Sequence, residues 1–248
     1  MLMKDKRWLV WFGAGLVALA AALHVMHFLI FRDAHHILIY LLGDIAFVPV
    51  EVLLVTLVLH QVLGRWEKRG RLHKLNMVIG AFFSEVGAGL LRRMRGLDCT
   101  DQIPPELRVH KEWSAKDYAV AVRFAALMKP SITLNSESAS QLREFLLQHR
   151  TFLLRLLENP YLLEHEVFTD LLWAVLHLTE ELAARTDLRA LPDSDLKHLS
   201  GDAERAYGRL LCQWLAYMNH LRSDYPYLYS LAIRLSPLDD EASPVVQQ

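Results

Sequence analysis

Two long apolar runs near the start of the chain restrict its fold more than any other feature. Residues 37–63 read ILIYLLGDIAFVPVEVLLVTLVLHQVL, with only two charged side chains, Asp44 and Glu51, and residues 8–30 contain no Asp, Glu, Lys or Arg. At about 1.5 Å per residue, a helix of either length crosses a bilayer core of about 30 Å. We therefore predict a transmembrane helical hairpin over residues 8–64, with spans 8–30 and 37–63 and an outer turn at 31–36.

A cleaved signal peptide is the alternative interpretation of the first run, because Ala20-Ala21-Ala22 resembles a cleavage site. The run continues past Ala22 to Ile30, so we predict that it stays as an anchor. The turn holds one basic residue, Arg32, whereas residues 65–74 hold five Lys or Arg. By the positive-inside rule, both termini are expected in the cytoplasm of a cell (inner) membrane protein, with residues 1–7 as an N-terminal tail.

Polar side chains inside the two spans form the first group of candidate functional residues. Helical spacing puts Tyr40, Asp44 and Glu51 on one face of the second span. Folding the hairpin about residues 33–34 puts His24 level with Asp44 and His27 level with Tyr40, and leaves Glu51 without a polar partner on the first span. The predicted intramembrane polar cluster therefore comprises His24, His27, Tyr40, Asp44 and Glu51.

This cluster has three interpretations, which the sequence leaves open. The first is hydrogen bonding between helices within a homo-oligomer, and the second is a proton or cation path. The third is a divalent metal site, because imidazole and carboxylate suit such ions. The candidate metal ligands are His24, His27, His35, His36 and Asp44. We predict no other cofactor.

Residues 65–97 are predicted to form a basic juxtamembrane helix. Its apolar residues recur at helical spacing, and His73, Lys74, Asn76 and Glu85 argue against a third span. Basic side chains at its two ends are candidates for contact with anionic lipid headgroups. These are Arg65, Lys68, Arg69, Arg71, Lys74, Arg92, Arg93 and Arg95.

From residue 98 the composition becomes that of an ordinary soluble domain, and we predict a cytoplasmic all-α domain over 98–236 with about five helices. Ser114 with Asp117 forms a capping box, Asn135 or Ser136 begins the next helix, and Asn159-Pro160 ends it. Residues 237–248 carry three acids without apolar periodicity, which predicts a disordered tail.

The amphipathic helix predicted over 165–185 carries the second group of candidates. Its polar face holds Trp173, His177 and Glu180, and a large aromatic side chain in a polar stripe is typical of a contact surface. Acid and His at helical spacing also suggest a carboxylate-bridged metal site, but no Glu-x-x-His motif recurs on a second helix, which favours a solvated face. Tyr225, Tyr227 and Tyr229 complete the candidate partner contacts.

Several classes of function lack support in this sequence. No phosphate-binding Gly loop, nucleophile elbow or zinc-ligand pattern occurs, and the basic residues form no nucleic-acid stripe. The chain has two cysteines, Cys99 and Cys212, without close spacing, which argues against a disulfide framework or a thiolate zinc site. We predict a non-catalytic, membrane-anchored interaction, scaffold or signalling protein that contacts lipid, forms a homo-oligomer and binds a cytoplasmic protein. The alternative is a subunit of an oligomeric proton, cation or metal-ion channel that uses Asp44, Glu51 and His24.

Overall fold

The computed structural model describes residues 4–99, 103–160, 162 and 165–246. The side chains of residues 4–7, 9, 64–69 and 71–73 lie outside this description. The described residues are helical apart from turns, loops and one isolated β-bridge between Asp98 and Ile132. They form two units, residues 1–68 and 69–248, which correspond to the hairpin and the C-terminal domain. The predicted all-α class is confirmed.

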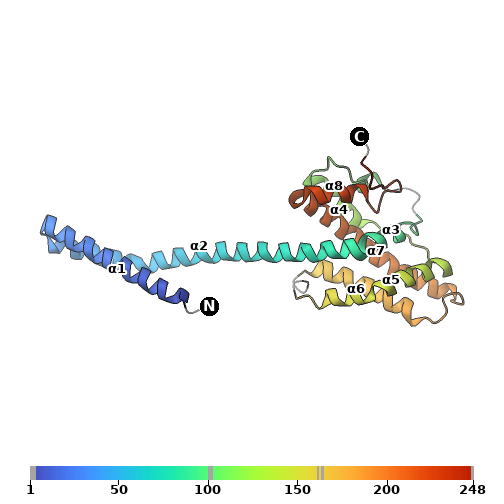
Figure 1. Ribbon diagram of the computed structural model, residues 1–248, viewed down its shortest axis with the longest axis horizontal. Coiled ribbons are helices and arrows are strands. Elements are labelled where there is room, and N and C mark those ends of the chain that lie inside the picture. Colours follow the sequence, from blue (N-terminus) through green and yellow to red (C-terminus); the bar gives the residue numbers. More distant parts are fainter. Residues whose placement is uncertain (1–3, 100–102, 161, 163–164, 247–248) are drawn as a thin grey trace. The chain divides into compact units, whose positions relative to one another are not determined.

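The hairpin unit consists of α1 (Lys4–Phe31) and the first part of α2 (Ala34–Phe82) (Figure 1). Its turn is shorter than predicted, because His35 and His36 already belong to α2. Arg32 adopts a left-handed conformation with φ 52°, and the Asp33 carboxylate accepts a hydrogen bond of 3.1 Å from the His36 backbone N–H. This aspartate cap stabilises a two-residue connection between the helices.

Helix α2 continues without a break beyond the predicted end of the second span, and Pro49 lies inside it. It is followed by a π-helical turn, η1 (Phe83–Gly87), and by α3 (Ala88–Arg95). By length and composition alone, three segments can cross a membrane: 10–31, 34–63 and 74–95. The first two bury none of their side chains, whereas 74–95 belongs to the core of the C-terminal domain.

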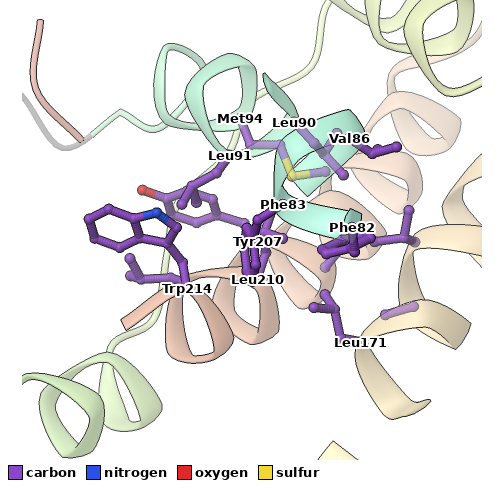
Figure 2. Close-up of a cluster of buried hydrophobic side chains, with 14 of the residues drawn as sticks. Phe82, Phe83, Val86, Leu90, Leu91, Met94, Leu171, Tyr207, Leu210 and Trp214 are labelled. Carbon is purple, nitrogen blue, oxygen red and sulfur yellow. The ribbon is translucent and has the colours of Figure 1, made fainter. Parts of the chain in front are cut away.

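The core of the C-terminal domain forms around this third segment and one long helix, α7 (Asp193–Asp224). Figure 2 shows the end of α2, η1 and α3 on one side and α7 on the other, with Leu171 approaching from α6. The Phe82 ring meets the Phe168 ring edge-on at 5.3 Å, and the Phe83 ring stacks on Tyr217 at 5.2 Å. These contacts place residues 75–94 inside the domain, so their apolar side is covered by protein.

The remaining elements are the 3₁₀ turn η2 (Pro105–Leu107), α4 (Ala115–Leu127), α5 (Ser136–Leu157), α6 (Glu166–Ala184) and α8 (Pro226–Arg234). Of these, α4, α6 and α8 pack against α7, while α5 packs against α6 and the short turn η2 against α4. The predicted caps are present, since Asp117 accepts hydrogen bonds from Ser114 and Asn135 accepts one from the Ser138 backbone N–H. Most of the predicted apolar faces of α5, α6 and α7 are buried. Val167 is an exception, with 59% of its surface exposed.

The segment after α8 folds back onto the domain, where the sequence suggests disorder. Leu238 is 4% exposed and joins the core, and the Asp240 carboxylate pairs with the Arg95 guanidinium. Arg234 donates a hydrogen bond to the Pro244 carbonyl. One ion pair, one hydrogen bond and one apolar anchor therefore hold a stretch whose composition is typical of disorder.

Candidate functional site

The ends of α6 and α7 that face each other bring together two histidines and two carboxylates. His177 and Glu181 lie one turn apart on α6, and His198 and Asp202 lie one turn apart on α7. The two helices run antiparallel, so His177 approaches Asp202 and His198 approaches Glu181. We call these four residues the His–carboxylate cluster.

The nitrogen and oxygen atoms of this cluster converge on a small volume. Asp202 Oδ2 lies 3.4 Å from His177 Nε2 and 3.5 Å from His198 Nε2. The Glu181 oxygens lie 3.9 Å from His177 Nε2 and 3.7 Å from His198 Nε2. Donor atoms of Glu181, His198 and Asp202 all lie within 4.8 Å of one another. All four distances exceed those of ordinary hydrogen bonds, about 2.7–3.2 Å.

Asp202 is the most unusual member of the cluster. Its side chain is 3% exposed, while those of His177 and His198 are 50% and 56% exposed. One carboxylate oxygen accepts a hydrogen bond of 2.7 Å from Arg205, and the other, Oδ2, is buried without a hydrogen-bond partner. Burying a carboxylate oxygen without a hydrogen-bond partner lowers the stability of the fold, and a donor or cation bound to this oxygen would recover that free energy.

Arg185 holds the outer side of the cluster in place. Its guanidinium donates hydrogen bonds of 2.9 Å to Glu181 and of 2.6 and 2.7 Å to Asp195. These hydrogen bonds hold the pKa of the Glu181 carboxyl and that of the Asp195 carboxyl below their ordinary values. Glu181 therefore stays ionised and oriented at neutral pH.

Sequence reasoning missed most of this cluster. It recognised His177 as part of a polar face, but it searched for Glu-x-x-His and overlooked Glu181, His198 and Asp202. The signal that could have found them is His-x-x-x-Glu on one helix followed by His-x-x-x-Asp on the next. Both pairs have i, i+4 spacing, and a short connection between antiparallel helices brings such pairs together.

The polar residues of the hairpin occupy different surroundings from those predicted. His24 bonds through Nδ1 to the Ala20 carbonyl oxygen at 3.0 Å, within its own helix. Among the described residues no ion pair joins His24 to Asp44, and both Asp44 and Glu51 are exposed in the single chain. In the described residues Asp44 thus has no ion pair with His24, the partner that hairpin folding suggested for it.

Aromatic contacts connect the predicted histidines near the turn. The His27 ring lies 6.2 Å from that of His36, and the His36 ring lies 4.6 Å from Tyr40. His35 is exposed. This row of rings links α1 to α2, but the compact group of metal-ligand atoms in the described residues belongs to the His–carboxylate cluster instead.

The predicted partner contacts differ in exposure. Trp173 is 59% exposed and Tyr227 is 72% exposed, whereas Tyr229 is 5% exposed and its hydroxyl bonds to that of Tyr118 at 2.9 Å. Tyr225 is half-buried. Glu180 is occupied by an ion pair of 2.7 Å with Arg150. Among the aromatic residues predicted to contact a partner, Trp173 and Tyr227 are therefore the two that are exposed.

The basic residues that we assigned to lipid headgroups fall into two groups. The side chains of Arg65, Lys68, Arg69 and Arg71 lie outside the described part of the chain, and Lys74 is exposed. The domain itself engages the other three. Arg92 donates to the Leu235 carbonyl, Arg93 lies 4.0 Å from the centre of the Phe145 ring, and Arg95 pairs with Asp240.

Comparison with known proteins gives matches along both units. Residues 4–63 match the family described as "MJ1433, N-terminal helical domain", and residues 71–234 match "Uncharacterized protein MJ1433, C-terminal helical domain". The chain is also similar to the "Uncharacterized protein MJ1433" of Methanocaldococcus jannaschii, with 43% identity over 240 residues that cover 97% of each chain. No solved structure matches.

Proposed function

Because this chain belongs to the family of the Methanocaldococcus jannaschii protein MJ1433, with its N-terminal and C-terminal helical domains in one polypeptide, we propose that the two parts act together. The hairpin anchors the protein in the membrane. The C-terminal domain stands in the cytoplasm and binds a protein partner without catalysing a reaction.

The exposed surface of the hairpin supports the membrane assignment. Large apolar side chains cover α1 and the first part of α2, and Trp11 and Leu42 are 74% and 70% exposed. Apolar patches of this extent are rare on soluble monomers and are typical of surfaces that meet lipid or protein. A bilayer around residues 10–31 and 34–63 provides that environment.

The observation that carries the interaction role is the exposure of Trp173. Its neighbours toward the start of α6, Asp170 and Glu166, are exposed acids on the same face. Trp is among the residues that contribute most to protein interfaces, and acids around it favour basic partners. The partner of this face is therefore a protein segment that presents an apolar side chain flanked by Lys or Arg.

Site-specific photocrosslinking tests this role in the full-length membrane protein. A photoreactive residue at position 173 should capture one protein, whereas the same residue at Leu127, which is 84% exposed on α4, should not. In purified form that protein should bind about 30-fold more weakly to Trp173→Ala, as expected for an interfacial Trp, and equally well to Leu127→Ala. Equal binding by wild type and Trp173→Ala would refute the role of this face. Capture of a second copy of the chain, or of lipid alone, would replace the proposed partner.

Topology is tested with single cysteines after replacement of Cys99 and Cys212 by Ser. A membrane-impermeant maleimide should label position 34 in intact cells, and position 243 only after permeabilisation. The positive-inside distribution of Lys and Arg is the reason for this orientation. Labelling of position 243 in intact cells would reverse it.

A channel subunit is the second candidate, because Asp44 and Glu51 are exposed in the hairpin of the single chain. Acids within a membrane span meet protein or water rather than lipid, so a second copy of the hairpin is needed to cover them. Two spans cannot enclose a pore, which makes this function depend on an oligomer.

A further inference from the structure

We propose that the His–carboxylate cluster is a binding site for one divalent transition-metal ion, such as Zn²⁺, held between α6 and α7. His177 and Glu181 supply ligands from α6, and His198 and Asp202 supply ligands from α7. The site lies in the C-terminal domain and is independent of the histidines of the hairpin.

The spacing of the donor atoms fits a tetrahedral ion. Ligands with bonds of about 2.0–2.2 Å to zinc stand about 3.3–3.6 Å apart in a tetrahedron. The Nε2 atoms of His177 and His198 lie 3.4 and 3.5 Å from the same Asp202 oxygen, Oδ2. The Glu181 carboxylate turns Oε1 toward His177 at 3.9 Å and Oε2 toward His198 at 3.7 Å. Ligand atoms of Glu181, His198 and Asp202 already lie within 4.8 Å of one another, and His177, which is half exposed, completes the set through a side-chain movement.

A second pair on α7 shows what a His–carboxylate contact without a metal looks like. His220 and Asp224 also have i, i+4 spacing, and there the nitrogen and oxygen lie 2.7 Å apart, at hydrogen-bond distance. In the cluster, both imidazoles face the same oxygen of Asp202 at 3.4 and 3.5 Å. These separations exceed hydrogen-bond distance and match those between two ligands of one ion, so a cation shared between the imidazoles and Oδ2 accounts for them.

The unpartnered oxygen of Asp202 gives independent support for a ligand. This carboxylate is 3% exposed, and its Oδ2 points toward the two imidazoles without a hydrogen bond. Its Oδ1 is fixed by Arg205, which orients the group in the way that outer partners orient metal-binding carboxylates. Arg185 orients Glu181 through a hydrogen bond to Oε2, while Oε1 faces His177. A bound cation would supply the interaction that the buried Asp202 Oδ2 lacks in the protein alone.

The donor types define the class of ion. Imidazole nitrogens suit Zn²⁺, Fe²⁺, Ni²⁺ and Cu²⁺, whereas Ca²⁺ and Mg²⁺ prefer sets of oxygen atoms only. Two histidines and two carboxylates therefore select a divalent transition metal over the alkaline-earth ions. Such an ion cross-links α6 to α7 and fixes the helix face that carries Trp173.

Equilibrium dialysis of the untagged full-length protein in detergent micelles measures binding directly. Wild type should bind one Zn²⁺ per chain, and His177→Gln and His198→Gln should each weaken binding about tenfold or more. The double variant His177→Gln/His198→Gln should lose the site. Both side chains are half exposed, so these substitutions leave the core intact, and circular dichroism verifies the fold.

Two control variants separate this site from other histidines. His220→Gln and the hairpin double variant His27→Gln/His36→Gln should bind Zn²⁺ as wild type does. Loss of binding in the hairpin variant with retention in His177→Gln/His198→Gln would overturn the proposal. The absence of stoichiometric binding by wild type at micromolar Zn²⁺ would overturn it as well.

Two further measurements report on the geometry and on folding. Co²⁺ bound to wild type should show the intense visible absorption of a tetrahedral site, and this band should disappear in Asp202→Asn. Zn²⁺ should raise the unfolding temperature of wild type and leave that of His177→Gln/His198→Gln unchanged, because a ligand of the native state stabilises it by mass action. An equal shift in both proteins would exclude the site.

Discussion

Tyr207 is a buried phenol on α7 whose proton the folded protein holds tightly. Burial, and secondarily the charge of Asp98, raises the pKa of Tyr207 from 10.0 to about 12. The unfolded chain releases this proton more readily than the folded one, so stability is complete below pH 10 and falls as pH rises toward 12. Phe has no ionisable group, so Tyr207→Phe should lack the part of the alkaline stability loss that comes from this phenol.

Chemical unfolding of wild type and Tyr207→Phe between pH 8 and 12 measures the effect. The difference in unfolding free energy should be constant below pH 9. It should change by about 1–3 kcal/mol in favour of the variant by pH 12, since each pKa unit corresponds to about 1.4 kcal/mol. A difference that stays constant across the whole range would show that the phenol proton is not linked to folding.

At the scale of single residues, sequence reasoning found what local chemistry determines. Ser114, Asp117 and Asn135 cap helices because their side chains reach backbone N–H groups within three residues. The exposure of Trp173 followed from helical periodicity. Asp202 was missed because its role depends on His177, 25 positions away on another helix, and only tertiary contact reveals that relation.

At the scale of helical elements, the π-helical turn at 83–87 is the feature with the sharpest test. A Cβ atom added at Gly87 would lie 2.6 Å from Phe83 Cδ1 and 2.7 Å from Phe82 Cε1, and both rings are buried. Gly87→Ala should therefore destabilise the domain by about 1–3 kcal/mol through overpacking.

Gly208 in the middle of α7 is the matched control. A Cβ atom there meets nothing within 4 Å, so Gly208→Ala should stabilise the protein by about 0.4–1 kcal/mol by restricting the unfolded chain. Denaturant unfolding of the two variants should give opposite signs. If both glycine variants were destabilised, or neither were, crowding at the π-helical turn would not explain the effect of Gly87→Ala on the free energy of unfolding.

The position of helices was predictable from periodicity and caps, but the continuity of α2 and the π-helical turn was not. Gly64, Gly70 and the charged stretch between them suggest a boundary, yet α2 runs on to Phe82. Apolar side chains at 75, 79, 82, 83 and 86 find partners on α6 and α7, and this packing outweighs local propensity. Phe82 and Phe83 are both buried at the start of the π-helical turn, and the local sequence does not predict this wider turn.

At the scale of the whole molecule, Glu51 distinguishes an anchored interaction protein from a channel. If the hairpin only anchors the domain, Glu51→Gln should leave assembly and stability unchanged, because the amide has the same size as the carboxyl group and no function depends on the acid. Wild-type protein in liposomes should then conduct neither protons nor cations. Flux measured at several pH values, together with the oligomeric state in detergent, provides the test. Flux that is present in wild type and disappears in Glu51→Gln would establish the channel and displace the interaction role.

The position of α7 along the chain has a consequence for synthesis. The apolar stripe at 75–94 emerges from the ribosome long before Leu210 and Leu211, which follow Met94 by more than 100 residues and cover it in the folded domain. At about 5–20 residues per second, this stripe waits roughly 6–23 s for its partner. If the hairpin is membrane-inserted as proposed, the nascent chain during that interval exposes a third segment that by length and composition could also cross a bilayer. The charges of Lys74, Arg92, Arg93 and Arg95 at its ends oppose its insertion and keep the segment available for the domain that is still being made.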